Sequence, residues 1–128
     1  MSTDEGKLLV FVLDDDESLR TMLASYLEMS GRCTVCGMES VRELERHSSE
    51  LPHLFAAILD INLGADVPTG IDAYRWLRSR GFAGRIIFLT GHARNHPSVQ
   101  EAYLIGDAKV LEKPTEMVHL ESAIFQAA

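Results

Sequence analysis

Acidic residues follow two apolar stretches of this chain at the point where each stretch ends. The run Asp14–Asp16 comes directly after Val10–Leu13, and Asp60 follows Phe55–Leu59. Buried strands of a parallel sheet read as nearly continuous apolar runs, and open α/β sheets place their sites just beyond the carboxyl ends of the strands. We therefore expect these carboxylates to meet at one edge of a sheet.

Two more apolar stretches end in side chains of a different kind. Ile86–Leu89 is followed by Thr90, and Lys109–Glu112 is followed by Lys113. Because these stretches also have the pattern of parallel strands, the same sheet edge should gather acids, one hydroxyl and one cation. Such a combination suits a hard divalent cation together with a phosphoryl group.

The acids match the coordination preference of Mg²⁺, or of Mn²⁺ in its place. Mg²⁺ prefers octahedral oxygen ligation, keeps several waters, and takes one or two carboxylates plus phosphate oxygens. We expect Asp15 and Asp60 to bind the ion directly and Asp14 to act through a water. The backbone carbonyl of Asn62 could complete the set. Crowded carboxylates raise each other's pKa unless a cation neutralises them, so the cluster indicates a metal site.

Asp60 is also a candidate nucleophile toward phosphorus. Carboxylates form covalent acyl phosphates in several classes of protein. Thr90 can donate a hydrogen bond to a phosphoryl oxygen, and Lys113 can supply a point charge to it. Catalysis of phosphoryl transfer is largely positioning and charge neutralisation, which these groups are suited to provide.

The overall composition narrows the class of protein. A chain of 128 residues with 46% hydrophobic and 24% charged residues is typical of one globular domain, here spanning 1–128. Its net charge of −7 argues against direct binding of nucleic acid, which needs a cationic face. Its apolar runs are too short for a bilayer, and its polar N-terminus is no signal peptide. We expect a cytoplasmic protein without membrane association, with 1–7 as a flexible N-terminus.

Strand-like and helix-like patterns alternate along the chain. Strands are expected at 8–13, 33–36, 55–59, 85–89 and 109–112, each followed by a helix. Strict alternation predicts an α/β fold, a doubly wound (βα)₅ five-stranded parallel sheet with helices on both faces. Right-handed crossovers make the flavodoxin-like order 2-1-3-4-5 the natural one. This order places the first and third strands, which end in the acids, side by side.

Capping signals mark where several helices should begin. Asp16 should cap the first helix, Ser40 the second and Thr69 the third, while Pro97 suits the first turn of the fourth. The positions expected to face the core are Leu19, Met22, Leu23, Tyr26 and Leu27 in the first helix, Ile71, Tyr74 and Leu77 or Trp76 in the third, Val99, Tyr103 and Leu104 in the fourth, and Met117, Leu120 and Ile124 in the fifth.

Two pairs of potential metal ligands are interpreted as structural. Cys33 and Cys36 lie three apart within a strand-like stretch, so their side chains should point to opposite faces of the sheet. A zinc site would need two more ligands at suitable spacing, and we interpret both cysteines as small buried residues. His92 and His96 lie four apart, but Pro97 follows directly, which favours a loop over a helical metal-binding pair.

The chain resembles the receiver domain of two-component response regulators, the CheY-like superfamily. Four pieces carry the resemblance: Val12–Arg20, Asp60 at its strand end, Phe88–His92 and Leu111–Pro114. They occur in the family's order and spacing and extend over nearly the whole chain. The resemblance implies a phosphorylation-activated signalling switch with the fold expected above.

The resemblance also implies a role for each matching residue. Asp60 would accept the phosphoryl group from a sensor histidine kinase or a histidine phosphotransfer protein, with Mg²⁺ bound. Thr90, followed by Gly91, would be the switch hydroxyl, and Lys113 the phosphate-binding lysine. The peptide bond before Pro114 is cis in many family members. Such a receiver catalyses its own phosphorylation and slow dephosphorylation and is not a metabolic enzyme.

The sequence departs from the family pattern at two places. The segment 64–69 lacks the usual proline after Leu63 and is about two residues longer, and Asp66 adds a charge there. Val110 stands where the family often has an aromatic residue that rotates inward, so Val110 cannot act as that gate. By resemblance, Asn62 and His92 would modulate the lifetime of the phosphoryl group.

Other functions remain open at this point. One alternative is a pseudo-receiver, an interaction module that acts without phosphorylation, which the altered loop and Val110 favour. Another is a phosphohydrolase with an aspartyl nucleophile, although such enzymes want a second aspartate where Asn62 stands. If the chain is a whole protein, it acts on another protein; if an output domain has been removed, that domain is the target. Homodimerisation on activation is a further expectation.

Overall fold

The protein, described here from a computed structural model over residues 6–125, folds as an α/β domain. Its five strands form one parallel sheet in the order β2-β1-β3-β4-β5, which confirms the predicted topology. Of the predicted flexible segment 1–7, residues 1–5 lie outside the described part. In chain order the elements are β1 Leu8–Leu13, α1 Glu17–Met29, β2 Cys33–Met38, α2 Val41–Glu45, the 3₁₀ helix η1 Ser48–His53, β3 Leu54–Asp60, α3 Gly70–Ser79, β4 Arg85–Thr90, α4 Pro97–Ile105, β5 Lys109–Glu112 and α5 Met117–Phe125.

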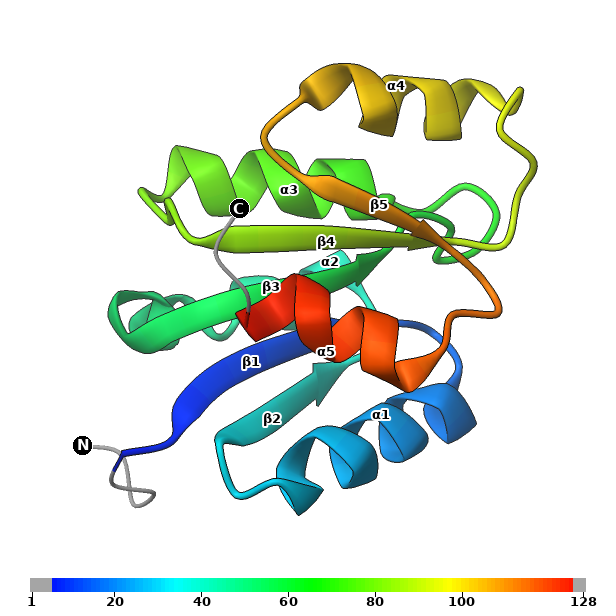
Figure 1. Ribbon diagram of the computed structural model, residues 1–128. Coiled ribbons are helices and arrows are strands. Elements are labelled where there is room, and N and C mark those ends of the chain that lie inside the picture. The colour runs from blue at the N-terminus through cyan, green and yellow to red at the C-terminus, as the bar shows by residue number, and fades with distance from the viewer. Residues whose placement is uncertain (1–5, 126–128) are drawn as a thin grey trace.

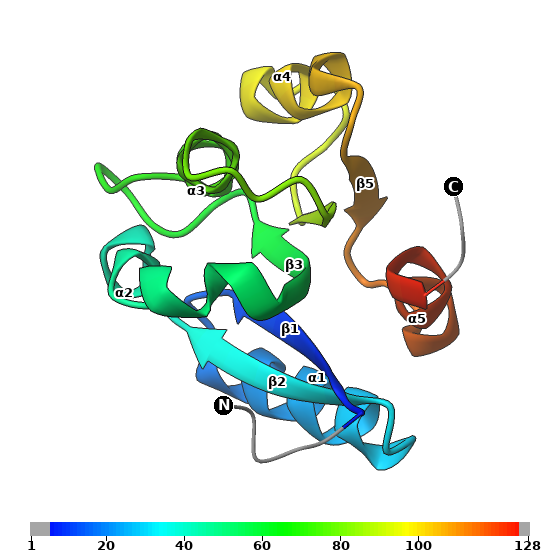
Figure 2. The ribbon, with the colours of Figure 1, turned by 90° about the vertical axis from the view of Figure 1, so that its left-hand side faces the viewer.

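Helices cover both faces of the sheet (Figures 1 and 2). One core cluster lies between the sheet and the face of α2, α3 and α4, and it includes Phe11 and Phe88. The second cluster lies under α1 and α5 and includes Val12 and Ile58. Successive residues of a strand point to opposite faces, so the central strands are apolar at every position and feed both clusters.

The register of the central strands brings the predicted site residues together. Leu13 pairs with Leu59 across β1 and β3, and Asp60 pairs with Leu89 across β3 and β4. The residues that follow these positions therefore leave the sheet at the same edge. The site described below lies at this edge.

The predicted caps are confirmed. The side chain of Asp16 accepts hydrogen bonds from the backbone N–H groups of Ser18 and Leu19 at the start of α1. Ser40 caps α2, and Thr69 caps α3 through a reciprocal pair of hydrogen bonds with Asp72. Pro97 is in the first turn of α4, as expected from its fixed φ.

The prediction for the inward face of α4 is wrong at two positions. Tyr103 is 39% exposed and Leu104 is 85% exposed, whereas Val99 and Ala102 are fully buried. The apolar residues of this helix surround most of its circumference, so periodicity alone did not identify the face that packs. Met22 of α1, also predicted inward, is 49% exposed at the rim of the stripe that includes Leu23.

The segment after β2 is less regular than the single helix that was expected there. α2 has five residues and is followed by η1, which contains Pro52. Cys33 is buried in the α1–α5 face, as predicted. Cys36 points to the opposite face, also as predicted, but it is half-buried rather than buried, because only the short segment of α2 and η1 covers it.

Candidate functional site

Three carboxylates meet at the carboxyl edge of the sheet. Oxygen atoms of Asp14, Asp15 and Asp60 all lie within 4.8 Å of one another. Asp14 is 1% exposed and Asp60 is 5% exposed, while Asp15 is open to solvent. This arrangement brings together the acids that were expected to meet and leaves one side accessible to a ligand.

Local hydrogen bonds fix the backbone and side chain of Asp14. Its N–H donates to Met38 O, and its Oδ1 accepts from the N–H of Asp16 at 2.9 Å. Nη1 of Arg20 donates to the carbonyl oxygen of Asp14 at 2.7 Å. Sequence reasoning did not assign this role to Arg20, although its place one turn into α1 and on the same face as Asp16 could have indicated it.

The side chain of Lys113 lies between the two buried acids. Its Nζ is 3.0 Å from Asp14 Oδ2 and 3.3 Å from Asp60 Oδ2. Its backbone N–H donates to Thr90 O at 2.7 Å, which ties the end of β5 to the end of β4. The Lys113–Pro114 peptide bond is cis, as expected. Lys113 is therefore positioned to contact anything bound between the carboxylates.

Burial and crowding perturb the protonation of these groups. Burial and, to a smaller extent, the charge of Asp14 together raise the pKa of Asp60 to about 6, against the opposing effects of Lys113 and the N–H of Asn62. Burial alone would lower the pKa of Lys113, but its hydrogen bond to Asp14 and the charge of Asp60 raise it. Two buried carboxylates against one cation leave an unbalanced negative charge, which a divalent cation would neutralise.

The donor set fits a hard divalent cation. All three side chains offer carboxylate oxygens, and exposure of Asp15 leaves room for the waters that Mg²⁺ retains. The N–H of Asn62 donates to Asp60 Oδ1 at 3.3 Å, which places the Asn62 peptide beside the acids.

Thr90 and Gly91 follow the last residue of β4 that pairs with β3. Thr90 is 1% exposed, and its Oγ1 accepts a hydrogen bond from the N–H of His92 at 3.0 Å. A methyl group added at Gly91 would meet no atom within 4 Å. Thr90 thus takes part in the structure of the β4–α4 loop, and Gly91 leaves open space there.

The two residues predicted to modulate phosphoryl lifetime contact each other. Nδ2 of Asn62 lies 3.1 Å from Nε2 of His92, and Oδ1 of Asn62 accepts from the N–H of Gly64. The rings of His92 and His96 stack with 4.3 Å between centroids. Both histidines precede the helical residues of α4, as expected for a loop.

The segment 64–69 leads from β3 back to the site at Gly70. Asp66 is exposed and has φ of 60°, a conformation that aspartate and asparagine tolerate better than most residues. A Cβ atom added at Gly70 would lie 2.3 Å from the carbonyl oxygen of Asp60. Only glycine therefore permits α3 to begin so close to Asp60. Val110, the other departure from the family pattern, is half-buried and packs against the core beside α4.

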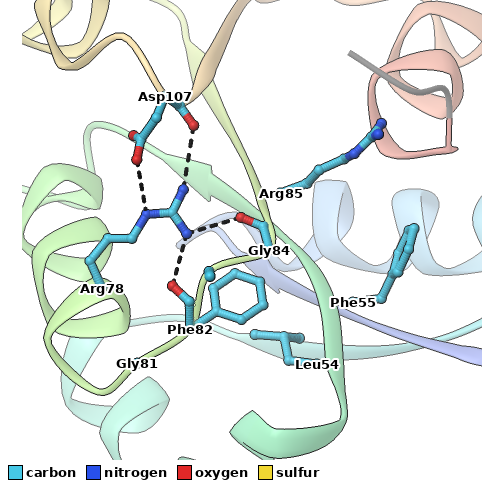
Figure 3. Close-up of a pocket in the computed structure, with 9 residues that line it drawn as sticks. Leu54, Phe55, Arg78, Gly81, Phe82, Gly84, Arg85 and Asp107 are labelled. Carbon is cyan, nitrogen blue, oxygen red and sulfur yellow. Dashed lines mark hydrogen bonds and ion pairs between the residues drawn. The ribbon is translucent and has the colours of Figure 1, made fainter.

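A cavity of about 850 Å³ lies at the opposite edge of the sheet, where β3 and β4 begin (Figure 3). Arg78 lines it and donates from Nη1 to the carbonyl oxygens of Phe82 and Gly84, both at 2.9 Å. Its Nε is 3.3 Å from a carboxylate oxygen of Asp107. These partners occupy the guanidinium of Arg78 in holding the turn before β4. Arg85, the other cation that lines the cavity, donates from Nη1 to the backbone carbonyl oxygens of Ala123 and Ile124.

Comparison with known proteins decides the family. The family model described as response regulator receiver domain matches residues 10–125, nearly the whole chain. The chain belongs to this family. The receiver is 32% identical over 123 residues to the transcriptional regulatory protein FixJ of Azorhizobium caulinodans, covering 91% of this chain and 53% of that protein. It therefore spans about half the length of this curated relative.

Solved structures show the same fold. A response regulator receiver protein from Pseudomonas putida superposes with a TM-score of 0.81 at 22% identity, covering 94% of the receiver and 98% of that chain. The chemotaxis protein CheY4 of Vibrio cholerae gives a TM-score of 0.77 at 24% identity, with 95% and 99% covered. The receiver thus has the CheY-like fold predicted from its sequence. Within residues 6–125, none of its helices has the length and hydropathy needed to cross a bilayer.

Membership of this family indicates the general role of the chain. It is the receiver domain of a two-component response regulator, a class whose members are generally phosphoacceptor switches rather than enzymes with a turnover substrate.

Proposed function

We propose that Asp60 accepts a phosphoryl group from a sensor histidine kinase or a histidine phosphotransfer protein. The observation that carries the proposal is the placement of Asp60 beside one cation and two other acids. Lys113 Nζ lies 3.3 Å from its Oδ2, and oxygen atoms of Asp14 and Asp15 lie within 4.8 Å of it. A buried carboxylate with these neighbours is suited to attack phosphorus once a metal ion offsets the negative charge.

Each residue has a defined part in the proposed transfer. A carboxylate oxygen of Asp60 forms the new P–O bond while the P–N bond of the phosphohistidine breaks, and the histidine nitrogen keeps the electron pair. Asp15, Asp60 and the carbonyl of Asn62 would hold Mg²⁺ or Mn²⁺, with Asp14 acting through a water. The ion supplies charge neutralisation to the phosphoryl oxygens. Lys113 exchanges its contact with Asp60 for one with the phosphoryl group.

The proposed switch begins with the charge that the phosphoryl group adds. Thr90 would turn its hydroxyl from the N–H of His92 toward a phosphoryl oxygen. Lys113 is bonded to Thr90 through the backbone, so the two loops would move together. Val110 cannot serve as a rotating aromatic residue, and the change would be transmitted through the β4–α4 and β5–α5 loops themselves.

The receiver would catalyse its own phosphorylation and its slow dephosphorylation, because the proposed groups sit on the receiver itself. Its output would be a change in binding to a downstream protein or an attached output domain, with homodimerisation one form of that change. Similarity to a transcriptional regulatory protein supports a transcriptional output. We place this exchange in the cytoplasm, where response regulators typically act.

Intact-mass analysis tests the proposal. The receiver is incubated with Mg²⁺ and acetyl phosphate or a phosphoramidate, and the adduct of one phosphoryl group is expected at about 80 Da. Asp60→Asn should lose the adduct. Asp66→Asn is the matched control and should keep it, since asparagine tolerates the positive φ at this exposed position.

Other results would favour one of the two alternative functions, a pseudo-receiver or a phosphohydrolase. Absence of an adduct with every small donor and with a purified kinase would contradict the proposal and favour a phosphate-independent pseudo-receiver. Steady turnover of a phosphomonoester would favour a phosphohydrolase, although the side chain of Asn62 is an amide held by His92 and cannot act as the acid or base.

A further inference from the structure

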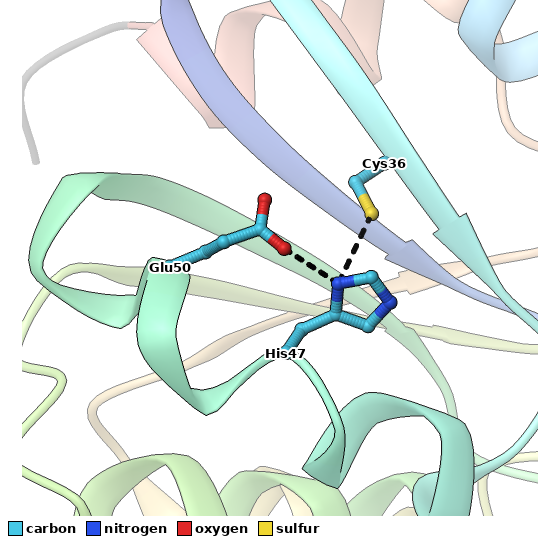
Figure 4. A group of neighbouring side chains, drawn as sticks. All are labelled: Cys36, His47 and Glu50. Carbon is cyan, nitrogen blue, oxygen red and sulfur yellow. Dashed lines mark hydrogen bonds and ion pairs between the residues drawn. The ribbon is translucent and has the colours of Figure 1, made fainter. Parts of the chain in front are cut away.

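A second group of potential metal ligands lies away from the acidic edge. Cys36 of β2, His47 between α2 and η1, and Glu50 of η1 place one ligand atom each within 4.8 Å of the others. Figure 4 shows the sulfur and a carboxylate oxygen approaching the same ring nitrogen from different sides. Sγ of Cys36 is 3.8 Å from Nδ1 of His47, and Oε2 of Glu50 is 2.6 Å from it.

This geometry differs from that of a nucleophilic triad. In a cysteine–histidine–acid triad one ring nitrogen faces the thiol and the other faces the acid. Here Nδ1 of His47 faces both Cys36 and Glu50, so the ring cannot relay a proton from one to the other. In addition, burial and the charges of Glu50 and Glu43 raise the pKa of Cys36 to about 11, which disfavours a free thiolate.

A metal ion requires ligand atoms that surround a common point at suitable distances from one another. Ligand atoms around a tetrahedral Zn²⁺ are about 3.3–3.8 Å apart, given bonds of about 2.0–2.3 Å. The sulfur and nitrogen already have a suitable separation of 3.8 Å. The carboxylate of Glu50 must withdraw from 2.6 Å by roughly 0.7 Å, and its 41% exposed side chain has the freedom to do so.

We infer that Cys36, His47 and Glu50 form a binding site for Zn²⁺ or a similar borderline-soft divalent cation, with solvent in the fourth position. A thiolate, an imidazole and a carboxylate are the ligand types that Zn²⁺ combines in proteins. The side chains of His47 and Glu50 are 29% and 41% exposed, so the ion enters directly from solvent. The ion joins edge strand β2 to the α2–η1 segment that covers it.

Binding changes the protonation of two ligands. The S–H bond of Cys36 breaks, the sulfur electron pair forms the S–Zn bond, and the proton passes to solvent. The proton that Nδ1 of His47 shares with Glu50 also leaves that nitrogen. It reappears on Nε2 if the ring is neutral and passes to solvent if the ring is charged. The nearby charges of Glu43 and Glu50, which oppose a free thiolate, favour the arrival of a dication.

Titration of the full chain with Co²⁺ tests the site, because thiolate ligation of Co²⁺ gives charge-transfer absorption in the near ultraviolet. We expect the band in the wild type, its loss on addition of Zn²⁺, and its loss in Cys36→Ser. Cys33→Ser is the matched control and should keep the band, since Cys33 lies on the opposite face of the sheet. Asp60→Asn should also keep it, which separates this site from the proposed phosphoacceptor site.

The half-exposed ligands provide variants that are not expected to disturb folding. His47→Gln and Glu50→Gln retain the thiol and should weaken Co²⁺ and Zn²⁺ binding by about tenfold or more. Circular dichroism of each metal-free variant verifies the fold. The inference is overturned if the wild type gives no charge-transfer band in excess Co²⁺, if folded Cys36→Ser keeps the band, or if folded Cys33→Ser loses it.

Discussion

Asn62 and His92 are joined by a hydrogen bond whose direction the structure determines, with 3.1 Å between Nδ2 and Nε2. Oδ1 of Asn62 accepts a hydrogen bond from the N–H of Gly64 at 3.1 Å, so the amide nitrogen faces the ring. Nε2 of His92 is therefore the acceptor, and the proton of the neutral ring is on Nδ1. The contact joins the loop after β3 to the loop after β4 beside Asp60.

This contact predicts coupled effects on phosphoryl lifetime. Asn62→Ala and His92→Ala should each speed loss of the adduct by about threefold to tenfold, because the joined loops narrow the approach of water to the acyl phosphate. The double variant should be no faster than the faster single variant, since each change breaks the same contact. Decay is followed by intact mass after removal of the donor. His119→Ala, at an exposed position of α5, is the control. Multiplicative rates in the double variant would show that the two residues act independently.

The raised pKa of Asp60 predicts how stability depends on pH. The folded carboxyl has a pKa of about 6 against an unfolded value of 3.8, so the folded state binds more protons between these values. The Asp60 carboxyl therefore makes its full contribution to the free energy of unfolding below the unfolded pKa. This contribution is lost as the pH rises through about 6. In metal-free buffer at pH 7.5, Asp60→Asn should therefore be more stable than the wild type, with a free energy of unfolding about 1–3 kcal/mol higher. Urea titrations should show this difference vanishing near pH 4; a difference that grew on acidification would contradict the assignment.

Binding of Mg²⁺ should weaken in acid for the same reason. A protonated Asp60 is a poor ligand, so affinity should fall as pH drops through about 6. We expect about a tenfold loss for each pH unit below that value when one proton competes with the ion. Isothermal titration calorimetry at a series of pH values measures the change. Asp66→Asn should follow the wild-type profile, and an affinity that is constant from pH 7.5 to 5 would exclude Asp60 as a ligand.

Removal of the cation between the acids should destabilise the metal-free protein. Lys113→Gln leaves Asp14 and Asp60 as neighbours without their shared positive charge and should cost about 1–3 kcal/mol at pH 7.5. Saturating Mg²⁺ should restore most of this loss, because the ion neutralises the same carboxylates. Lys109→Gln on β5 is the matched control, since Lys109 is exposed. Equal losses in the two lysine variants would place the stabilisation outside the acidic cluster.

Two glycines of the site should respond differently to alanine. Gly70→Ala places a methyl group 2.3 Å from the carbonyl oxygen of Asp60 and should cost about 2 kcal/mol or more through displacement of α3 or β3. Gly91→Ala adds a methyl group with no atom within 4 Å and should change stability by less than about 1 kcal/mol. Denaturant unfolding of both variants compares them directly. A Gly70→Ala variant as stable as Gly91→Ala would mean that the start of α3 is free to move.

Much of the fold and of the acidic edge follows from local patterns. Apolar runs that end in Asp14 and Asp60 gave the strands and their order, because continuous apolar strands alternating with helices have few ways to pack. The caps at Asp16 and Thr69 were also readable, since each depends on hydrogen bonds within a few residues. The buried face of α4 could not be predicted from the sequence, because apolar residues surround that helix and only packing selects Val99 and Ala102.

The sequence by itself therefore determined the sheet, its order and the gathering of acids, hydroxyl and lysine at one edge. Tertiary structure alone decided which side chains touch there and elsewhere: Arg20 against the carbonyl of Asp14, Asn62 against His92, and Cys36 beside His47 and Glu50. Strand order determines, to within a few ångströms, where the carboxyl ends of the strands lie relative to one another. A hydrogen bond or a ligand set needs atoms placed to a fraction of that distance, which depends on rotamers and on how each loop and short helix packs.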